Sequence, residues 1–184
     1  MKINHAVAAV GLTMLALSTT GAALAASKVQ VDAGVVATLS QFESLNSSNK
    51  TLAGKSAGLL VFPSVTKGGV GVAAEHGVGV LQIDGATVGY YSVSAGSVGL
   101  TVGVAKHSEI IMFMTKQALD KFQATNGWSI GADAGITMVS ASANGTYDSK
   151  IENKPILAFQ FSDKGLLGDL SIEGEKVSQI KTPQ

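Results

Sequence analysis

The spacing of apolar residues along the chain changes near residue 58. Before this point apolar positions recur every three or four residues, which is the period of one face of an α-helix. A polar tract at residues 46–50 ends this pattern. The sequence therefore predicts an N-terminal amphipathic helix whose apolar face consists of Val31, Val35, Leu39 and Phe42.

Beyond residue 58 the pattern becomes that of β-strands. Residues 97–105 and 129–139 alternate between apolar and small or polar side chains, which is typical of strands with one buried face. The runs 110–114 and 156–161 are almost continuously apolar, as expected for strands that are covered on both faces. Pro63 is expected to stop the short apolar run that begins at residue 59.

Two turn motifs indicate how these strands are connected. Asp84-Gly85 and Asn144-Gly145 each separate two strand-like segments, and such pairs favour two-residue hairpins between antiparallel strands. Residues 115–125 predict a second, short helix with Thr115 as its N-cap. Glycines that recur on one face of a strand leave room for another backbone to approach closely.

Together these elements predict one α+β domain. Its sheet is expected to be mostly antiparallel, Gly-rich and strongly curved, either barrel-like or sandwich-like. An N-terminal amphipathic helix and one further short helix complete it. No linker divides the part of the chain that carries these patterns.

The first 25 residues have the features of a cleaved secretory signal peptide. Lys2 precedes an apolar run at residues 6–17, and Ala23-Leu24-Ala25 fits the A-x-A cleavage pattern. The run is shorter than the roughly 20 residues that a membrane-spanning helix needs. We therefore expect a signal peptide at residues 1–25 and a single domain at residues 26–184, located in the periplasm or secreted, or peripheral to the envelope membrane.

The composition narrows the classes of function. Lys+Arg and Asp+Glu are both 13, every basic residue is a lysine, and charged residues make up only 14% of the chain. A nucleic-acid binder that relies on a basic surface is therefore excluded. The absence of cysteine excludes disulfides, thiolate metal sites and catalytic thiols. The 22 glycines fall mainly in the strand-like region, where they fit turns and close packing.

The short motifs that resemble catalytic or metal sites lack the further residues or spacing that such sites require. Gly54-Lys55-Ser56 lacks the earlier glycine and the following helix of a phosphate-binding loop. Ser64–Lys67 fits S-x-x-K but lacks the accompanying K-T-G. Glu75, His76 and His107 have no spacing typical of metal ligands, and both histidines are expected at the surface near hairpin ends. We therefore predict no catalytic residues, no metal site, no cofactor and no enzymatic activity.

Asp133 is the one acid on the polar side of an otherwise small and apolar strand. A carboxylate paired with a lysine or a backbone N–H is favoured there over a ligand-binding role. A hydrolase stays the least favoured alternative for the whole chain.

Five segments form a recognisable set: Ala57–Gly69 (AGLLVFPSVTKGG), Gly77–Leu81 (GVGVL), Val88–Ser92 (VGYYS), Gly127–Asp133 (GWSIGAD) and Gly165-Leu166. Considered together, they resemble the SYLF domain family, which is described as lipid-binding. The resemblance extends from Val31 to Ile180 and implies a non-enzymatic domain that binds membrane lipids. Eukaryotic members are associated with phosphoinositides and the actin cytoskeleton, and bacterial members with secreted or envelope-attached proteins.

This resemblance implies lipid contacts through the N-terminal helix and nearby lysines. Asp32 and Glu43 offset the flanking cations, and without arginine no guanidinium can bind a phosphate through two hydrogen bonds. The expected partners are membrane lipids, anionic phospholipids among them, and not nucleic acid. Two alternatives stay open: a carrier of a small apolar ligand inside a closed β-domain, and a structural protein-interaction module without a lipid role. The predicted lipid-binding residues are Lys28, Val31, Val35, Leu39, Phe42, Lys50, Lys55 and Lys67.

Overall fold

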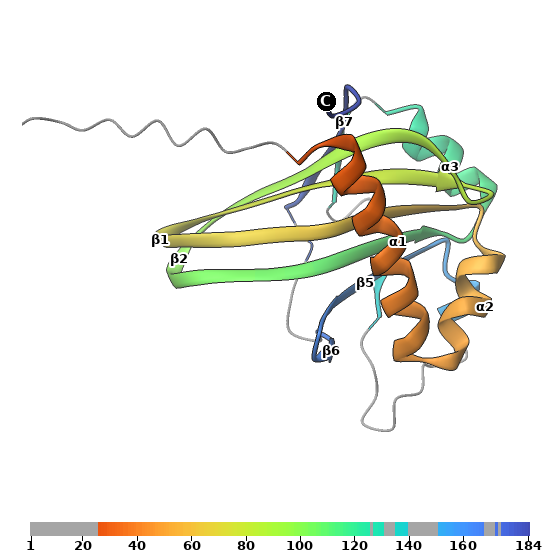
Figure 1. Cartoon of the computed structure of the whole chain (residues 1–184), viewed down its shortest axis with the longest axis horizontal. Helices are drawn as coiled ribbons and strands as arrows, with labels where there is room; N and C mark the ends of the chain where they lie inside the picture. The colour runs from red at the N-terminus through yellow and green to blue at the C-terminus, as the bar shows by residue number, and fades with distance from the viewer. Residues whose placement is uncertain (1–25, 126, 131–134, 140–150, 168–171, 173) are drawn as a thin grey trace, which may run out of the picture.

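A computed structural model describes residues 26–184 except 126, 131–134, 140–150, 168–171 and 173. The predicted signal peptide, the Asn144-Gly145 turn and Asp133 lie outside these residues. The described chain is α+β, with three α-helices, one short 3-10 helix and a strongly curled sheet that forms a half-barrel (Figure 1).

The predicted N-terminal helix is confirmed as α1, Lys28–Leu45. Ser27 caps it: its hydroxyl accepts from the Gln30 backbone N–H, and the Gln30 side chain accepts from the Ser27 N–H. The polar tract does end α1, but it also begins α2, Ser47–Lys55, which the sequence pattern did not predict. Asn46 marks this boundary because its side chain accepts from the Ser48 N–H and so caps the second helix.

Two very long strands dominate the sheet. β1, Gly58–Ile83, and β2, Ala86–Phe113, pair antiparallel along their length. They are joined by the predicted Asp84-Gly85 turn, where both residues have positive φ, 51° and 77°, as a tight type I′ hairpin requires. Pro63 ends the short apolar run but does not end β1. The strand continues through a register shift between Phe62 and Val65, and such a bulge accommodates a residue without an N–H.

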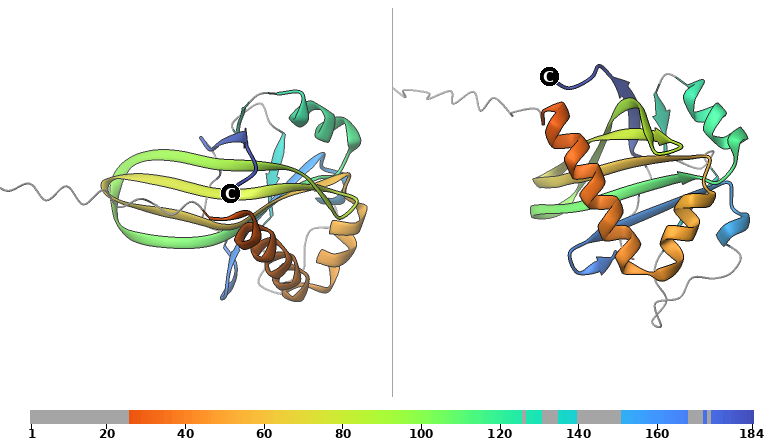
Figure 2. Two further views of the ribbon diagram at one scale, coloured as in Figure 1. Left: turned by 45° about the horizontal axis from the view of Figure 1, so that its top comes forward. Right: turned by 45° about the vertical axis from the view of Figure 1, so that its right-hand side comes forward.

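The ribbon formed by β1 and β2 bends back on itself at the end farthest from α2 and α3 (Figures 1 and 2). The bend coincides with a register shift between Val70 and Val72. The two halves of β1 then lie so close that a Cβ on Gly79 would be 2.1 Å from the Val61 carbonyl oxygen. The predicted role of strand glycines in close backbone approach is thus confirmed.

Shorter strands and one helix complete the domain. Helix α3, Lys116–Gln123, has Thr115 as its N-cap as predicted, since the Thr115 hydroxyl accepts from the Ala118 N–H. The strand order in the described part is β3-β7-β2-β5-β4, with β1 on β2 and β6 on β5, and the β4–β5 pair alone is parallel. The remaining elements are β3 (Trp128–Ser129), β4 (Ile136–Met138), the 3-10 helix Ile151–Asn153, β5 (Ile156–Ser162), β6 (Gly165–Leu166) and β7 (Lys176–Ile180).

The apolar runs at the end of β2 and in β5 separate two hydrophobic clusters, which confirms that these strands are covered on both faces. Ile110 and Met112 point into a cluster beneath α1, whereas Ile111 and Phe113 point into a cluster beneath α3. This alternation is the two-residue period of a strand, with both sides apolar. The sheet is therefore the central layer, with α1 on one face and α3 on the other (Figure 2).

Candidate functional site

The apolar face of α1, which was predicted to contact lipid, is packed against the sheet. Val31, Val35 and Phe42 are buried, and Leu39 is half-buried beside them. The Phe42 ring meets the Phe159 ring edge to face, with 4.8 Å between their centroids. In this packed position the three buried side chains have no surface to offer to a membrane.

The start of α1 is also tied to the sheet by polar contacts. The Tyr90 hydroxyl donates to Asp32 Oδ1 at 2.9 Å, and Lys28 pairs with the other oxygen of the same carboxylate. This hydrogen bond from Lys28 lowers the pKa of Asp32. Lys28 Nζ also lies 5.8 Å from the centroid of the Tyr90 ring. Lys28 is therefore engaged within the protein, although it is exposed.

The other predicted lysines are not gathered into one patch. Lys50 and Lys55 are exposed on α2, beyond the far end of α1 from Lys28. Lys67 lies on β1 and forms an ion pair with Glu75, with 3.4 Å between Nζ and Oε2. These positions leave the described structure without a basic surface built from the four lysines.

A group of exposed apolar side chains lies at the bend of the β1–β2 ribbon. Val70, Val72 and Val104 are 79%, 62% and 74% exposed there. Val104 is paired with Gly68, and Val70 lies two residues farther along on the same face. Exposed Lys106 shares the face of Val104, two residues along β2. We call Val70, Val72, Val104 and Lys106 the ribbon end.

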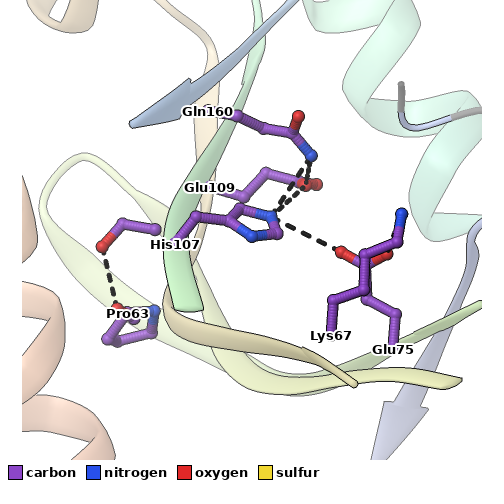
Figure 3. A network of polar contacts seen from close by, with 7 residues as sticks. Pro63, Lys67, Glu75, His107, Glu109 and Gln160 are labelled. Atoms are coloured by element: carbon purple, nitrogen blue, oxygen red, sulfur yellow. Dashed lines mark hydrogen bonds and ion pairs between the residues drawn. The ribbon is translucent and has the colours of Figure 1, made fainter. Parts of the chain in front are cut away.

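A network of buried polar side chains lies between the two halves of the ribbon (Figure 3). The Gln160 amide donates to Glu109 Oε2 at 2.9 Å, and His107 Nε2 lies 3.5 Å from Glu75 Oε1. Glu175, just before β7, is 1% exposed. No group in the described residues donates a hydrogen bond to either of its carboxylate oxygens. The network thus gathers side chains from β1, β2, β5 and the start of β7.

Burial changes the pKa values of three titratable side chains in this network. Burial raises the pKa of Glu109 to about 7. Burial, together with the charge of Glu109 beside it, raises the pKa of Glu175 to about 10. Burial lowers the pKa of His107, although the nearby Glu75 charge opposes this change. At neutral pH, Glu175 is therefore a neutral acid whose proton can be donated to Glu109.

The expectation that both histidines are at the surface is wrong for His107, whereas His76 is exposed. A signal for burial was present in the sequence. His107 and Glu109 are in the same two-residue phase as Ile111 and Phe113, which point into the core. Among the described residues no group of three or more His, Cys, Asp or Glu side chains is arranged to hold a metal ion.

Two further observations concern the chain as a whole. Within the described residues no helix combines the length and apolar character needed to cross a bilayer. No curated protein matched the sequence.

A family comparison did give a match. Residues 94–182 match the protein family Ysc84, described as Las17-binding protein actin regulator, which is the SYLF domain family. The matched segment begins within β2 and continues past β7, so it contains four members of the buried network, His107, Glu109, Gln160 and Glu175. On this match, the chain carries a domain of the SYLF (Ysc84) family over residues 94–182.

Proposed function

We propose that this protein is a non-enzymatic component of the bacterial envelope that binds membrane surfaces through the ribbon end. The observation that carries the proposal is the exposure of Val70, Val72 and Val104 at the bend of the ribbon, with Lys106 on the same face. Exposed apolar groups gathered at one end of a domain are typical of interaction sites. The expected secretory signal favours a membrane lipid, rather than a cytoskeletal protein, as the ligand.

The chemistry of the ribbon end suits a lipid bilayer. Complete transfer of a valine side chain from water to an apolar medium stabilises by about 1.5 kcal/mol. Each lysine near an anionic surface adds about 1 kcal/mol. Valines contribute on any bilayer, whereas the contribution of Lys106 needs anionic lipid. We therefore expect weak binding to neutral vesicles and stronger, salt-sensitive binding to anionic ones.

Membrane insertion of the predicted apolar face of α1 is less favourable in this structure. It would require that Phe42 and its buried neighbours leave the core. Removing one buried Phe side chain from a core typically costs about 3–5 kcal/mol. The ribbon end needs no such rearrangement because its valines are already exposed.

Co-sedimentation with vesicles tests the proposal. The protein without residues 1–25 is mixed at low salt with phosphatidylcholine vesicles and with vesicles that also contain phosphatidylglycerol. We expect retention by the anionic vesicles, and a loss of at least fivefold in the triple variant V70S/V72S/V104S. The matched control V29S/V36S changes two exposed valines on the outer side of α1. It is expected to bind like the wild type.

Three results would overturn the proposal. No retention of the wild type on either vesicle would exclude membrane binding. Loss of binding in V29S/V36S but not in the triple variant would place the contact on α1. Dimerisation that the triple variant abolishes, without vesicle binding by the wild type, would make the ribbon end a contact between two copies of the chain. Circular dichroism of each variant verifies that it is folded.

A further inference from the structure

A second surface feature lies at the opposite end of the molecule from the bend of the ribbon. It is a cavity of about 300 Å³ between α3, β3 and the start of β5. This volume is at the lower end of the range of ligand sites, about 300–1,000 Å³. It suits a small molecule and not a complete two-chain lipid. Its principal lining residues are Ala118, Lys121, Phe122, Trp128, Pro155 and Ile156.

One wall of the cavity is an aromatic cluster held in fixed positions. Trp128 meets the ring of Phe122 nearly edge to face, with centroids 5.3 Å apart and an interplanar angle of 75°. Phe113, buried in the core, contacts both rings, with centroid distances of 6.1 Å to Trp128 and 4.8 Å to Phe122. Because Phe113 supports both rings from behind, the wall offers a preformed apolar surface.

The described residues that line the cavity carry charge of one sign. Lys121 is the charged residue among them, and they include no carboxylate. Lys116, five residues earlier on α3, is paired with Asp120 at 2.8 Å, whereas Lys121 has no carboxylate partner among the described residues. An apolar wall beside an ammonium group that has no carboxylate partner in the described part of the chain is complementary to a ligand with an apolar body and one negative charge.

We propose that this cavity binds a small monocarboxylate with an apolar body, of the size of a medium-chain fatty acid. The hydrocarbon part lies against Trp128 and Phe122, and the carboxylate pairs with Lys121. This site does not depend on membrane binding by the ribbon end, since the two regions share no residue. The protein would then hold a free acid in solution whether or not it also contacts a bilayer.

The single tryptophan of the chain makes the cavity directly measurable. Octanoate, below its micelle-forming concentration, is titrated into the protein while Trp128 fluorescence is recorded, and calorimetry is used as a second readout. Octanol serves as the neutral probe of equal chain length. We expect a saturable change with octanoate and weaker binding of octanol. Trp128 lies at the cavity, so bound hydrocarbon changes its surroundings.

Two lysine variants separate a specific site from general surface attraction. K121M keeps the length and helix propensity of the side chain but removes its charge. It is expected to weaken octanoate binding about tenfold or more, because a charge-assisted contact is lost, and to leave octanol binding unchanged. K116M, on the same helix, is expected to leave both affinities unchanged.

The proposal is overturned by any of four results. These are the absence of a saturable response in the wild type, equal affinities for octanoate and octanol, an equal loss in K116M and K121M, or loss of octanoate binding in V70S/V72S/V104S. The last result would place the ligand at the ribbon end. Vesicle co-sedimentation of K121M distinguishes the two proposals. This variant should be retained by vesicles as the wild type is, even when it no longer binds octanoate.

Discussion

The buried carboxyl groups are the residues whose chemistry differs most from that of exposed side chains. Glu109 and Glu175 are enclosed beside each other, with Gln160 and His107 close to Glu109. Lys67 forms an ion pair with Glu75 of the same network. Two neighbouring carboxylates in such an interior cannot both be ionised without a large cost, so a proton is retained. These two buried carboxyl groups therefore bind protons more tightly than they do in the unfolded chain.

The stability of the protein should consequently fall as the pH rises from 7 to 9. An ordinary Glu loses its proton near pH 4.5, whereas folded Glu175 keeps its proton until about pH 10. Between these two pH values the folded state thus binds more protons than the unfolded state. Each unit of pH increase therefore lowers the free energy of unfolding by up to about 1.4 kcal/mol. We expect a loss of about 1–2 kcal/mol, equivalent to roughly 2–8 °C in melting temperature. Scanning calorimetry at the two pH values measures it.

The variant E175Q tests whether Glu175 causes this loss of stability between pH 7 and pH 9. It removes the titrating group, so its melting temperature should change between pH 7 and pH 9 by half the wild-type amount or less. E43Q, at an exposed position of α1, should behave like the wild type. His107 has the opposite effect on the pH dependence of stability. Because its pKa is lowered in the folded state, it destabilises the protein below about pH 6.5. Measurement above pH 7 avoids this contribution. An unchanged slope in E175Q would contradict the assignment.

A second residue-scale prediction concerns the close contact inside β1. In G79A the new Cβ would be 2.1 Å from the Val61 carbonyl oxygen, and a backbone atom cannot easily move away. We expect a loss of about 1–3 kcal/mol or more in the free energy of unfolding, measured with urea. G96A, on β2, places its Cβ where no atom lies within 4 Å, and should change stability by about 0.5 kcal/mol or less. Equal stability of the two variants would contradict the folded-back ribbon.

Among the elements, α1 is the one whose apolar residues have a different contact in the structure from the one that the sequence predicted: the sheet in place of a lipid. The apolar spacing predicted the helix correctly, but a face suited to lipid has the same spacing as a face suited to a sheet. The structure places this face on β1 and β5, with Phe42 between Phe159 and Phe161. The outer side of the helix retains exposed Val29 and Val36, which is why they serve as controls for membrane binding.

The packing of α1 has a measurable energetic consequence. F42A should lower the free energy of unfolding by about 3–5 kcal/mol, since it leaves a cavity in a fully buried site. V36A, on the outer face of the same helix, should cost about 0.5 kcal/mol or less. Urea denaturation of both variants provides the comparison. A cost below about 1 kcal/mol for F42A would indicate that α1 is not packed in solution, and would restore its apolar face as a candidate for membrane insertion.

At the scale of the whole molecule, the folded-back ribbon separates three regions with different chemistry. The ribbon end carries exposed valines, the interior of the ribbon holds the buried carboxyl groups, and the cavity lies beside α3. The bend of the ribbon and α3 lie at opposite ends of the molecule (Figure 1). The two proposed binding regions are therefore independent. Variants of one should leave the other unaffected, as the experiments above require.

Local patterns in the sequence were sufficient for several elements because their causes are local. The period of apolar residues determined α1, the Asp84-Gly85 pair determined the hairpin, and continuous apolar runs determined the doubly covered strands. Each depends on neighbours within a few residues along the chain. The fold class and the SYLF resemblance followed from the same local features.

Tertiary structure alone decided which side chains meet. The network draws on four distant segments, which contribute Glu75, His107, Gln160 and Glu175. The bend of the ribbon brings Glu75 to His107, and the pairing of β5 and β7 with β2 adds Gln160 and Glu175. The same bend exposes Val70 and Val104, although their alternation resembles that of buried strand residues. Whether an apolar face meets the core, a ligand or water depends on long-range packing, which the period of a single strand or helix does not encode.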